Sequence, residues 1–125
     1  LKKFAIATPA HAPYGARAKE ALQHAGVWAD IEPRLVLGEN ISQAAQFATS
    51  GATQGGIIAL SLAKAPQVSA LGEFALIPES WHRRLAQRMV LLRGAPPAAR
   101  AFYDYLVTPS AQDIMRRHGF AMPDE

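Results

Sequence analysis

The sequence predicts an α/β fold with a mostly parallel sheet, and three observations support this prediction. Short, largely apolar runs at residues 4–7, 34–37 and 55–60 are typical of strands that are buried on both faces. Segments with the spacing of apolar residues expected for helices separate these runs. Such alternation of strand and helix is the pattern of βαβ units, whose strands lie parallel in one sheet.

The helices predicted between these strands have defined ends. Residues 14–25 show helical periodicity, and Gly26 is positioned to end that helix. Residues 41–50 show the same periodicity, and Asn40 is a suitable N-cap. A short helical turn is expected at residues 61–65.

The pattern changes after Pro66. Pro96 or Pro97 can open a helix at its first turn, and we expect Ser110 to cap the last helix. The elements predicted here are strands at residues 69–77 and 88–92 and helices at residues 98–106 and 111–118.

Composition restricts the class of protein. The chain has 125 residues, of which 50% are hydrophobic, enough for a compact domain with a core. The net charge of +3 raises the possibility of nucleic-acid binding, but the basic residues are scattered instead of clustering with aromatics on one element. We therefore expect no nucleic-acid partner. The absence of cysteine excludes a disulfide framework and a thiolate metal site.

The sequence contains no membrane-spanning run and no recognisable catalytic group of residues. No apolar run approaches the roughly 20 residues that cross a bilayer. The chain opens at Leu1 with neither an initiator Met nor a signal peptide, so we expect a processed chain or part of a longer one. None of the four histidines has metal-ligand spacing, and no nucleophile elbow or phosphate-binding loop occurs. These features favour a binding protein over an enzyme.

Two loops suggest a binding site. Residues 8–15 and residues 38–42 each leave a predicted strand and enter a helix. A helix start has backbone N–H groups without intrahelical partners and carries the positive end of the helix dipole. Both loops follow the carboxyl ends of parallel strands, where open α/β sheets bind ligands. Two such helix starts facing one cleft would bind an anion without any charged side chain.

The same loops resemble those of a known family. Residues 7–15 and 38–44 closely resemble the second-domain loops of periplasmic molybdate-binding proteins, the soluble receptors of ABC-type molybdate importers. Residues 56–61 and the helical segments near residues 101–106 and 117–120 are also similar to that family. The resemblance runs in order across essentially all 125 residues.

The resemblance implies which residues bind the ligand. In that family an oxyanion, molybdate or tungstate, lies between two domains, and the second domain donates backbone N–H groups at positions that correspond to Tyr14 and Ile41. No cofactor and no directly bound metal cation is implied. Ala59 stands where some members have a tyrosine that adds a hydroxyl donor, so that donor is missing here. The supporting loop residues are Pro13, Gly15, Asn40 and Ser42.

The resemblance also implies an architecture and partners. Residues 1–77 would form a lobe of the type II periplasmic-binding-protein fold. Residues 78–125 would contain a crossover strand and the C-terminal helices, which return to the first domain, whose N-terminal part is absent. The expected location is the periplasm, the expected partner is the membrane permease of the importer, and no reaction is expected. Without the first domain, apolar residues of the last two helices would be exposed and would promote self-association: Phe102, Leu106, Ile114 and Met115.

Two alternatives stay open from the sequence. One is a binding protein of the same fold for another small anion, such as sulfate or phosphate. The other is an effector-sensing or enzymatic module built on the same two-lobed fold. The loops of the first domain would separate the anions. The sequence upstream of Leu1 would separate a receptor from a sensor, because a signal peptide favours a receptor and a DNA-binding helix-turn-helix favours a sensor.

Overall fold

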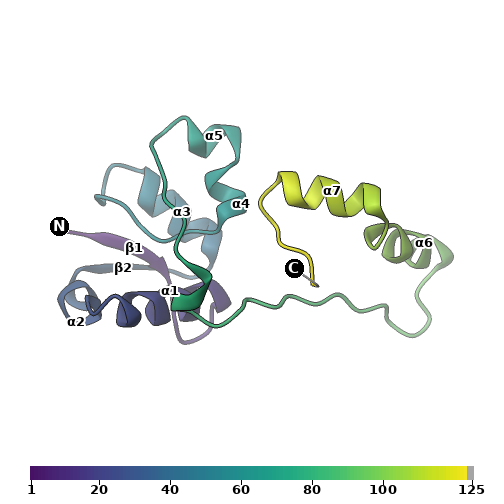
Figure 1. The fold of residues 1–125 in the computed structure, drawn as a ribbon, viewed down its shortest axis with the longest axis horizontal. Coiled ribbons are helices and arrows are strands. Elements are labelled where there is room, and N and C mark those ends of the chain that lie inside the picture. The colour runs from purple at the N-terminus through teal and green to yellow at the C-terminus, as the bar shows by residue number, and fades with distance from the viewer. Residues whose placement is uncertain (124–125) are drawn as a thin grey trace. The chain divides into compact units, whose positions relative to one another are not determined.

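The computed structural model describes residues 1–123, which divide into two units (Figure 1). The first unit is Leu1–Leu85, and the second begins at Ala86. Residues 124 and 125, which belong to the segment 78–125 predicted above, lie outside the described residues.

The first unit alternates strands and helices as predicted. Helices α1 and α3 and strands β1 and β2 match the predicted elements to within one residue, whereas the short α2 and η1 had not been expected. Its elements are β1 (Phe4–Ala7), α1 (Pro13–His24), α2 (Trp28–Ile31), η1 (Glu32–Arg34), β2 (Leu35–Gly38), α3 (Ile41–Thr49), α4 (Leu60–Ala63), α5 (Pro66–Ser69) and η2 (Glu79–Trp81).

The sheet is parallel, with β1 next to β2. Ala7 of β1 is opposite Gly38 of β2, so the two strands end at the same edge. The third predicted strand, residues 55–60, is shorter than expected and forms only a parallel bridge between Gly56 and Ala5. Hydrogen bonds of 2.9 Å from Ala5 N–H to the Gly55 carbonyl and from Ile57 N–H to the Ala5 carbonyl support this bridge. The chain then enters α4 at Leu60.

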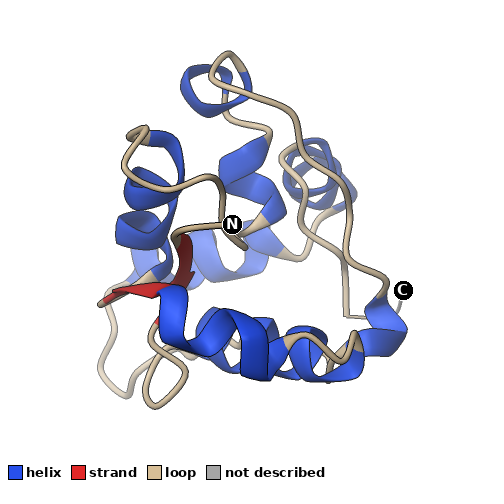
Figure 2. Cartoon of the chain, turned by 90° about the vertical axis from the view of Figure 1, so that its left-hand side faces the viewer, coloured by secondary structure: helices blue, strands red, loops and turns tan. Residues whose placement is uncertain are grey.

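Helices α1 and α3 cover opposite faces of this sheet (Figures 1 and 2). The three β1 residues Ala5, Ile6 and Ala7 are completely buried, as expected for a strand covered on both faces. The facing helix residues are mostly small, which lets the helices approach the sheet closely; they include Ala18, Ala21, Ala44 and Ala45.

The strands predicted at residues 69–77 and 88–92 are wrong. Residues 66–69 form α5, and residues 72–78 and 83–92 have no regular secondary structure. A strand is stable only when a neighbouring edge satisfies its backbone N–H and C=O groups, and among residues 1–123 these segments have no such edge. Their apolar side chains are accordingly exposed, among them Phe74, Leu76, Val90 and Leu92.

The described residues of the second unit form two helices, α6 (Pro97–Leu106) and α7 (Pro109–Arg117). Pro97 opens α6 as predicted. The predicted Ser110 cap is wrong, because Thr108 is the N-cap of α7 and its Oγ1 accepts the Ala111 N–H at 3.3 Å. Pro109 is the first residue of this helix, since the fixed φ of proline suits the first helical position.

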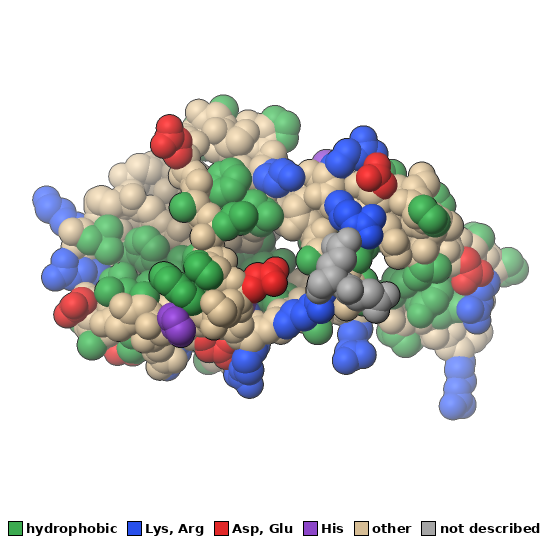
Figure 3. All heavy atoms as spheres, in the orientation of Figure 1, with side chains coloured by type: hydrophobic (Ala, Val, Ile, Leu, Met, Phe, Trp, Pro, Cys, Tyr) green, Lys and Arg blue, Asp and Glu red, His purple; other side chains and the backbone are tan. Residues whose placement is uncertain are grey.

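The helices of the second unit leave apolar side chains exposed. Phe102 is 62% exposed, Val107 57% and Ile114 41%, whereas Ala111 and Met122 are buried. Hydrophobic side chains are visible at the surface in Figure 3, interspersed with basic and acidic ones. Within residues 1–123, no helix combines the length and hydrophobicity needed to cross a membrane.

Candidate functional site

The first predicted loop joins β1 to α1 through a tight turn. The Thr8 carbonyl accepts a hydrogen bond from the Ala12 N–H at 2.9 Å, and α1 then begins at Pro13. Ala12 occupies the N-cap position, so no side chain caps the helix. Because Pro13 has no N–H, Tyr14 has the first free N–H group of α1, and no described residue accepts a hydrogen bond from it.

The second loop joins β2 to α3 and is capped as predicted. Asn40 Oδ1 accepts the Gln43 N–H at 2.9 Å, and Gln43 Oε1 accepts the Glu39 N–H at 2.7 Å. These reciprocal bonds satisfy the third N–H of the helix but leave the first two. The N–H groups of Ile41 and Ser42 therefore have no acceptor among residues 1–123.

The two loops are bonded to each other. Both the N–H and the Oγ1 of Thr8 donate to the Gly38 carbonyl, at 2.8 and 3.0 Å. The Nε2 atom of His11 lies 3.2 Å from the Glu39 carbonyl oxygen. In the sequence, Thr8 and His11 are recognisable only as loop residues. Neither has a side-chain pattern that would reveal this role, because their partners are main-chain atoms about thirty positions away.

Packing also brings the two helix starts together. Ala7, Ala12 and Ala44 form one buried cluster, and Ile41 packs against it. This cluster contains the end of β1, the N-cap of α1 and the first turn of α3. The starts of α1 and α3 therefore lie side by side at the carboxyl edge of the sheet.

Two glycines permit this close approach. A Cβ atom on Gly15 would lie 2.2 Å from the Ala7 carbonyl oxygen, and one on Gly38 would lie 2.6 Å from the Ala44 nitrogen. Both distances are too short for any side chain, and the opposing atoms are backbone. Each helix start is thus pressed directly against the end of a strand.

The remaining residues predicted for the site have different environments. Pro13, Asn40 and Ser42 are exposed, Tyr14 is half-buried, and Ala59 is buried at the N-cap of α4. Burial raises the pKa of the Tyr14 phenol, so this side chain adds no negative charge near neutral pH. Ala59 follows the Gly56 bridge by three residues and therefore lies on the carboxyl side of the third segment.

Among residues 1–123 no group of metal-ligating side chains is found, and the groove beside α1 does not include the predicted donors. In the described part of the chain, no three His, Asp or Glu side chains are grouped to hold a metal ion. A groove of about 640 Å³ lies beside α1 and β2 and is lined by Thr8, Lys19, Trp28 and Leu37 among others. Tyr14 and Ile41 do not line it, so this groove is separate from the predicted donors.

Comparison with known proteins identifies the class. A family model described as bacterial extracellular solute-binding protein matches residues 1–121. The chain belongs to this family, and its first unit is a periplasmic-binding-protein lobe with a parallel sheet.

Several relatives within this class are molybdate-binding proteins. The chain is 40% identical over 122 residues to the molybdate-binding protein ModA of Rhodobacter capsulatus, covering 96% of this chain and 47% of the relative. It is 33% identical over 121 residues to ModA of Escherichia coli K12, covering 96% and 46%. The chain thus spans about half the length of the curated relatives it matches.

A solved structure gives the same result. The periplasmic molybdate-binding protein of Azotobacter vinelandii superposes with a TM-score of 0.81 at 25% identity, covering 98% of this chain and 55% of that one. These comparisons confirm the predicted resemblance and do not favour the sulfate, phosphate or sensor alternatives.

Proposed function

We propose that this chain supplies one wall of an oxyanion site in the solute receptor of a bacterial ABC importer, with molybdate or tungstate as the ligand. The observation that carries the proposal is the pair of adjacent helix starts, where the N–H groups of Tyr14 and Ile41 are unbonded within residues 1–123. The similarity to molybdate-binding proteins supports the choice of anion.

The donor chemistry suits these anions. Molybdate and tungstate are tetrahedral dianions that have no proton near neutral pH, so each oxygen can only accept hydrogen bonds. Neutral N–H donors at the positive ends of helix dipoles match them without a counter-charge. Phosphate keeps a proton at that pH and would favour an additional acceptor, whereas sulfate would be excluded by size. Binding would occur without any chemical change in the anion.

In this proposal the second unit belongs to the other lobe of the receptor. In a two-lobed receptor, residues from about 78 onward would return to the other lobe, and that lobe would supply the remaining hydroxyl donors. Closure of the two lobes would bury the anion and present a closed surface to the membrane permease, in the periplasm. In the isolated chain, the exposed apolar side chains of α6 and α7 favour self-association.

An amide-resolved titration tests the proposed donors. The ¹⁵N-labelled chain is titrated at neutral pH with molybdate, and in parallel with sulfate and phosphate. We expect the largest shifts with molybdate, at the amides of Tyr14 and Ile41. The Ala111 amide, already bonded to Thr108 at the start of α7, is the internal control.

Shifts confined to other amides would contradict the assignment of the donors. Equal or larger responses to sulfate would contradict the choice of ligand. Because one wall alone is expected to bind weakly, the same titration on a protein that contains both lobes gives the decisive affinity.

A further inference from the structure

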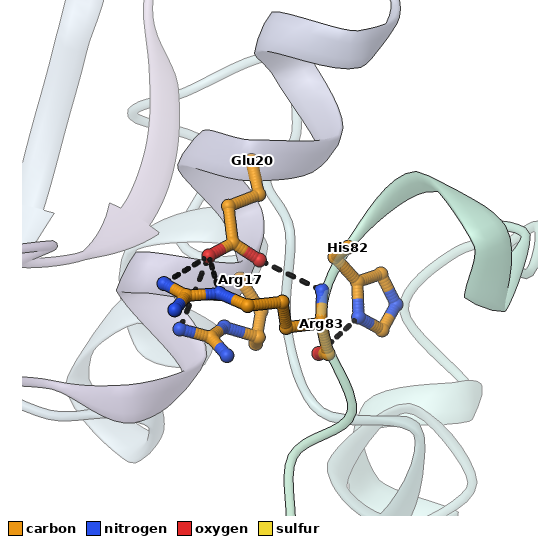
Figure 4. A network of polar contacts seen from close by, with 4 residues as sticks. All are labelled: Arg17, Glu20, His82 and Arg83. Carbon is orange, nitrogen blue, oxygen red and sulfur yellow. Dashed lines mark hydrogen bonds and ion pairs between the residues drawn. The ribbon is translucent and has the colours of Figure 1, made fainter.

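A polar cluster in the first unit attaches the segment after η2 to helix α1 (Figure 4). Glu20 of α1 accepts the backbone N–H of Arg83 at 2.8 Å through Oε2. Its Oε1 accepts the Nε of the same arginine at 2.8 Å and lies 2.7 Å from its Nη2. Arg17 Nη2, one turn earlier on α1, approaches Oε1 to 3.2 Å.

A second contact attaches the same segment further along α1. The rings of His24 and Trp81 stack with centroids 5.3 Å apart and an interplanar angle of 25°. Glu20 and His24 are four residues apart and therefore lie on one face of the helix. We call the four residues Glu20, His24, Trp81 and Arg83 the clasp.

The clasp differs from an ordinary surface ion pair. The Arg83 side chain is 79% exposed, but the Glu20 side chain is only 23% exposed, and one of its bonds comes from a backbone N–H, which holds the main chain itself. By contrast, Arg100 and Asp104 of α6 form a pair at 3.9 Å in which both side chains are more than 60% exposed. Exposed pairs of that kind contribute little to stability.

The clasp lies close to the end of the first unit. Arg83 precedes the last residue of the first unit, Leu85, by two positions. The preceding residues 72–78 are irregular, so they cannot brace this part of the chain by themselves. Helix α1, which carries Glu20 and His24, also contains Tyr14 in its first turn.

We propose that the clasp determines where the chain leaves the first unit. It holds residues 79–83 on α1, so that any change in the relative position of the two units takes place in the residues beyond Arg83. Glu20 acts in this as a positioning residue for the connecting segment. This inference goes beyond the proposed function and does not depend on which anion binds.

Hydrogen exchange on the 125-residue chain tests the clasp. The variant Glu20→Gln removes the charge and one strong acceptor, and Asp104→Asn makes the same chemical change at the exposed pair in α6. We expect Glu20→Gln to accelerate exchange of the Arg83 amide by about tenfold or more, because hydrogen bonds to charged groups contribute that much protection. Trypsin cleavage after Arg83 and Arg84 should accelerate in parallel. The Asp104→Asn variant should leave both rates unchanged.

A second variant keeps the proposal testable if Glu20→Gln disturbs folding. Arg83→Met removes the guanidinium but retains the backbone donor, so exchange across residues 79–85 should increase by less than in Glu20→Gln. The proposal is overturned if the Arg83 amide of a folded Glu20→Gln variant exchanges at the wild-type rate. It is equally overturned if Arg83→Met leaves exchange across residues 79–85 unchanged.

Discussion

Single residues determine how closely the helix starts approach the sheet, and Gly15 is the clearest case. A methyl group there would lie 2.2 Å from the backbone oxygen of Ala7, which cannot move without displacing β1. We therefore expect Gly15→Ala to lower the free energy of unfolding by about 1–3 kcal/mol or more, as overpacking in a tight core does. Gly72→Ala is the control, because a Cβ there would contact nothing within 4 Å. Urea unfolding of both variants provides the measurement, and equal midpoints would refute the steric argument.

Ile41 allows the proposed main-chain donor to be tested separately from its side chain. Proline is well tolerated at the first helical position, and the preceding Asn40 already has the extended backbone that proline requires. Ile41→Pro should therefore keep α3 while removing the N–H. In a two-lobed receptor, we expect molybdate affinity to fall by about 1–3 kcal/mol, roughly 5- to 150-fold.

Two further variants separate the main chain from the side chains. Ile41→Val and Tyr14→Ala both retain the backbone N–H and should bind molybdate nearly as the parent protein does. Isothermal titration calorimetry measures all three variants. A proline variant with undiminished affinity would show that the Ile41 amide is not a donor.

Among the helices, α3 should depend on its N-cap for stability. Asn40 accepts the Gln43 N–H, and no other side chain caps this helix. We expect Asn40→Ala to reduce the free energy of unfolding by about 0.5–2 kcal/mol. Gln46→Ala, at an exposed position in the same helix, should change stability little. The comparison is made by thermal or urea unfolding, and similar losses in both variants would mean that the cap has no special role.

The attachment of η2 to α1 should depend on pH. The hydrogen bond from the Arg83 N–H lowers the pKa of Glu20, and the guanidinium groups of Arg83 and Arg17 lower it further, although partial burial opposes them. A carboxylate whose pKa is lower in the folded state stabilises the fold above its unfolded pKa, and this stabilisation is lost as the pH falls through the folded pKa. The clasp should therefore be lost at a lower pH than the ordinary pKa of a glutamate would give.

A pH titration of the Arg83 amide chemical shift measures this dependence. Its midpoint should lie below the usual value for a glutamate, and Glu20→Gln should abolish the transition. A midpoint above that value would mean that the partial burial of Glu20 outweighs its hydrogen bonds. Glu20 and Arg83 line the groove beside α1, which is also lined by Lys19 and Glu32, and Lys19 Nζ lies 4.9 Å from the centre of the Trp28 ring.

At the scale of the whole molecule, the exposed apolar side chains predict self-association of the 125-residue chain. Phe102 is 62% exposed and Ile114 is 41% exposed, whereas Leu106 and Met115 are partly covered. Light scattering coupled to size exclusion should detect oligomers that become fewer in Phe102→Ser. Val107 is also exposed, so the variant Val107→Ser indicates whether the loss of oligomers is specific to Phe102 or follows from any exposed apolar residue near α6. A monomer at all concentrations, with tight binding of molybdate, would contradict this expectation.

The sequence determined the features that depend on local chemistry. Apolar runs located β1 and β2, helical spacing located α1, α3 and α6, and Asn40 identified the start of α3, because propensity and capping act over a few neighbouring residues. The pairing of strand and helix also predicted which edge of the sheet would hold the two helix starts. The identity of the proposed donors, Tyr14 and Ile41, came from a resemblance, since main-chain donors leave no side-chain pattern.

Features that depend on partners distant in sequence are visible in the folded chain alone. Residues 72–77 and 88–92 have strand-like composition but no regular structure, because a strand exists only where another edge satisfies its backbone. The contacts of Thr8 and His11 with the second loop, and of Glu20 with Arg83, join positions about thirty and sixty-three residues apart. Their geometry follows from how the chain folds back on itself, which local propensity does not encode.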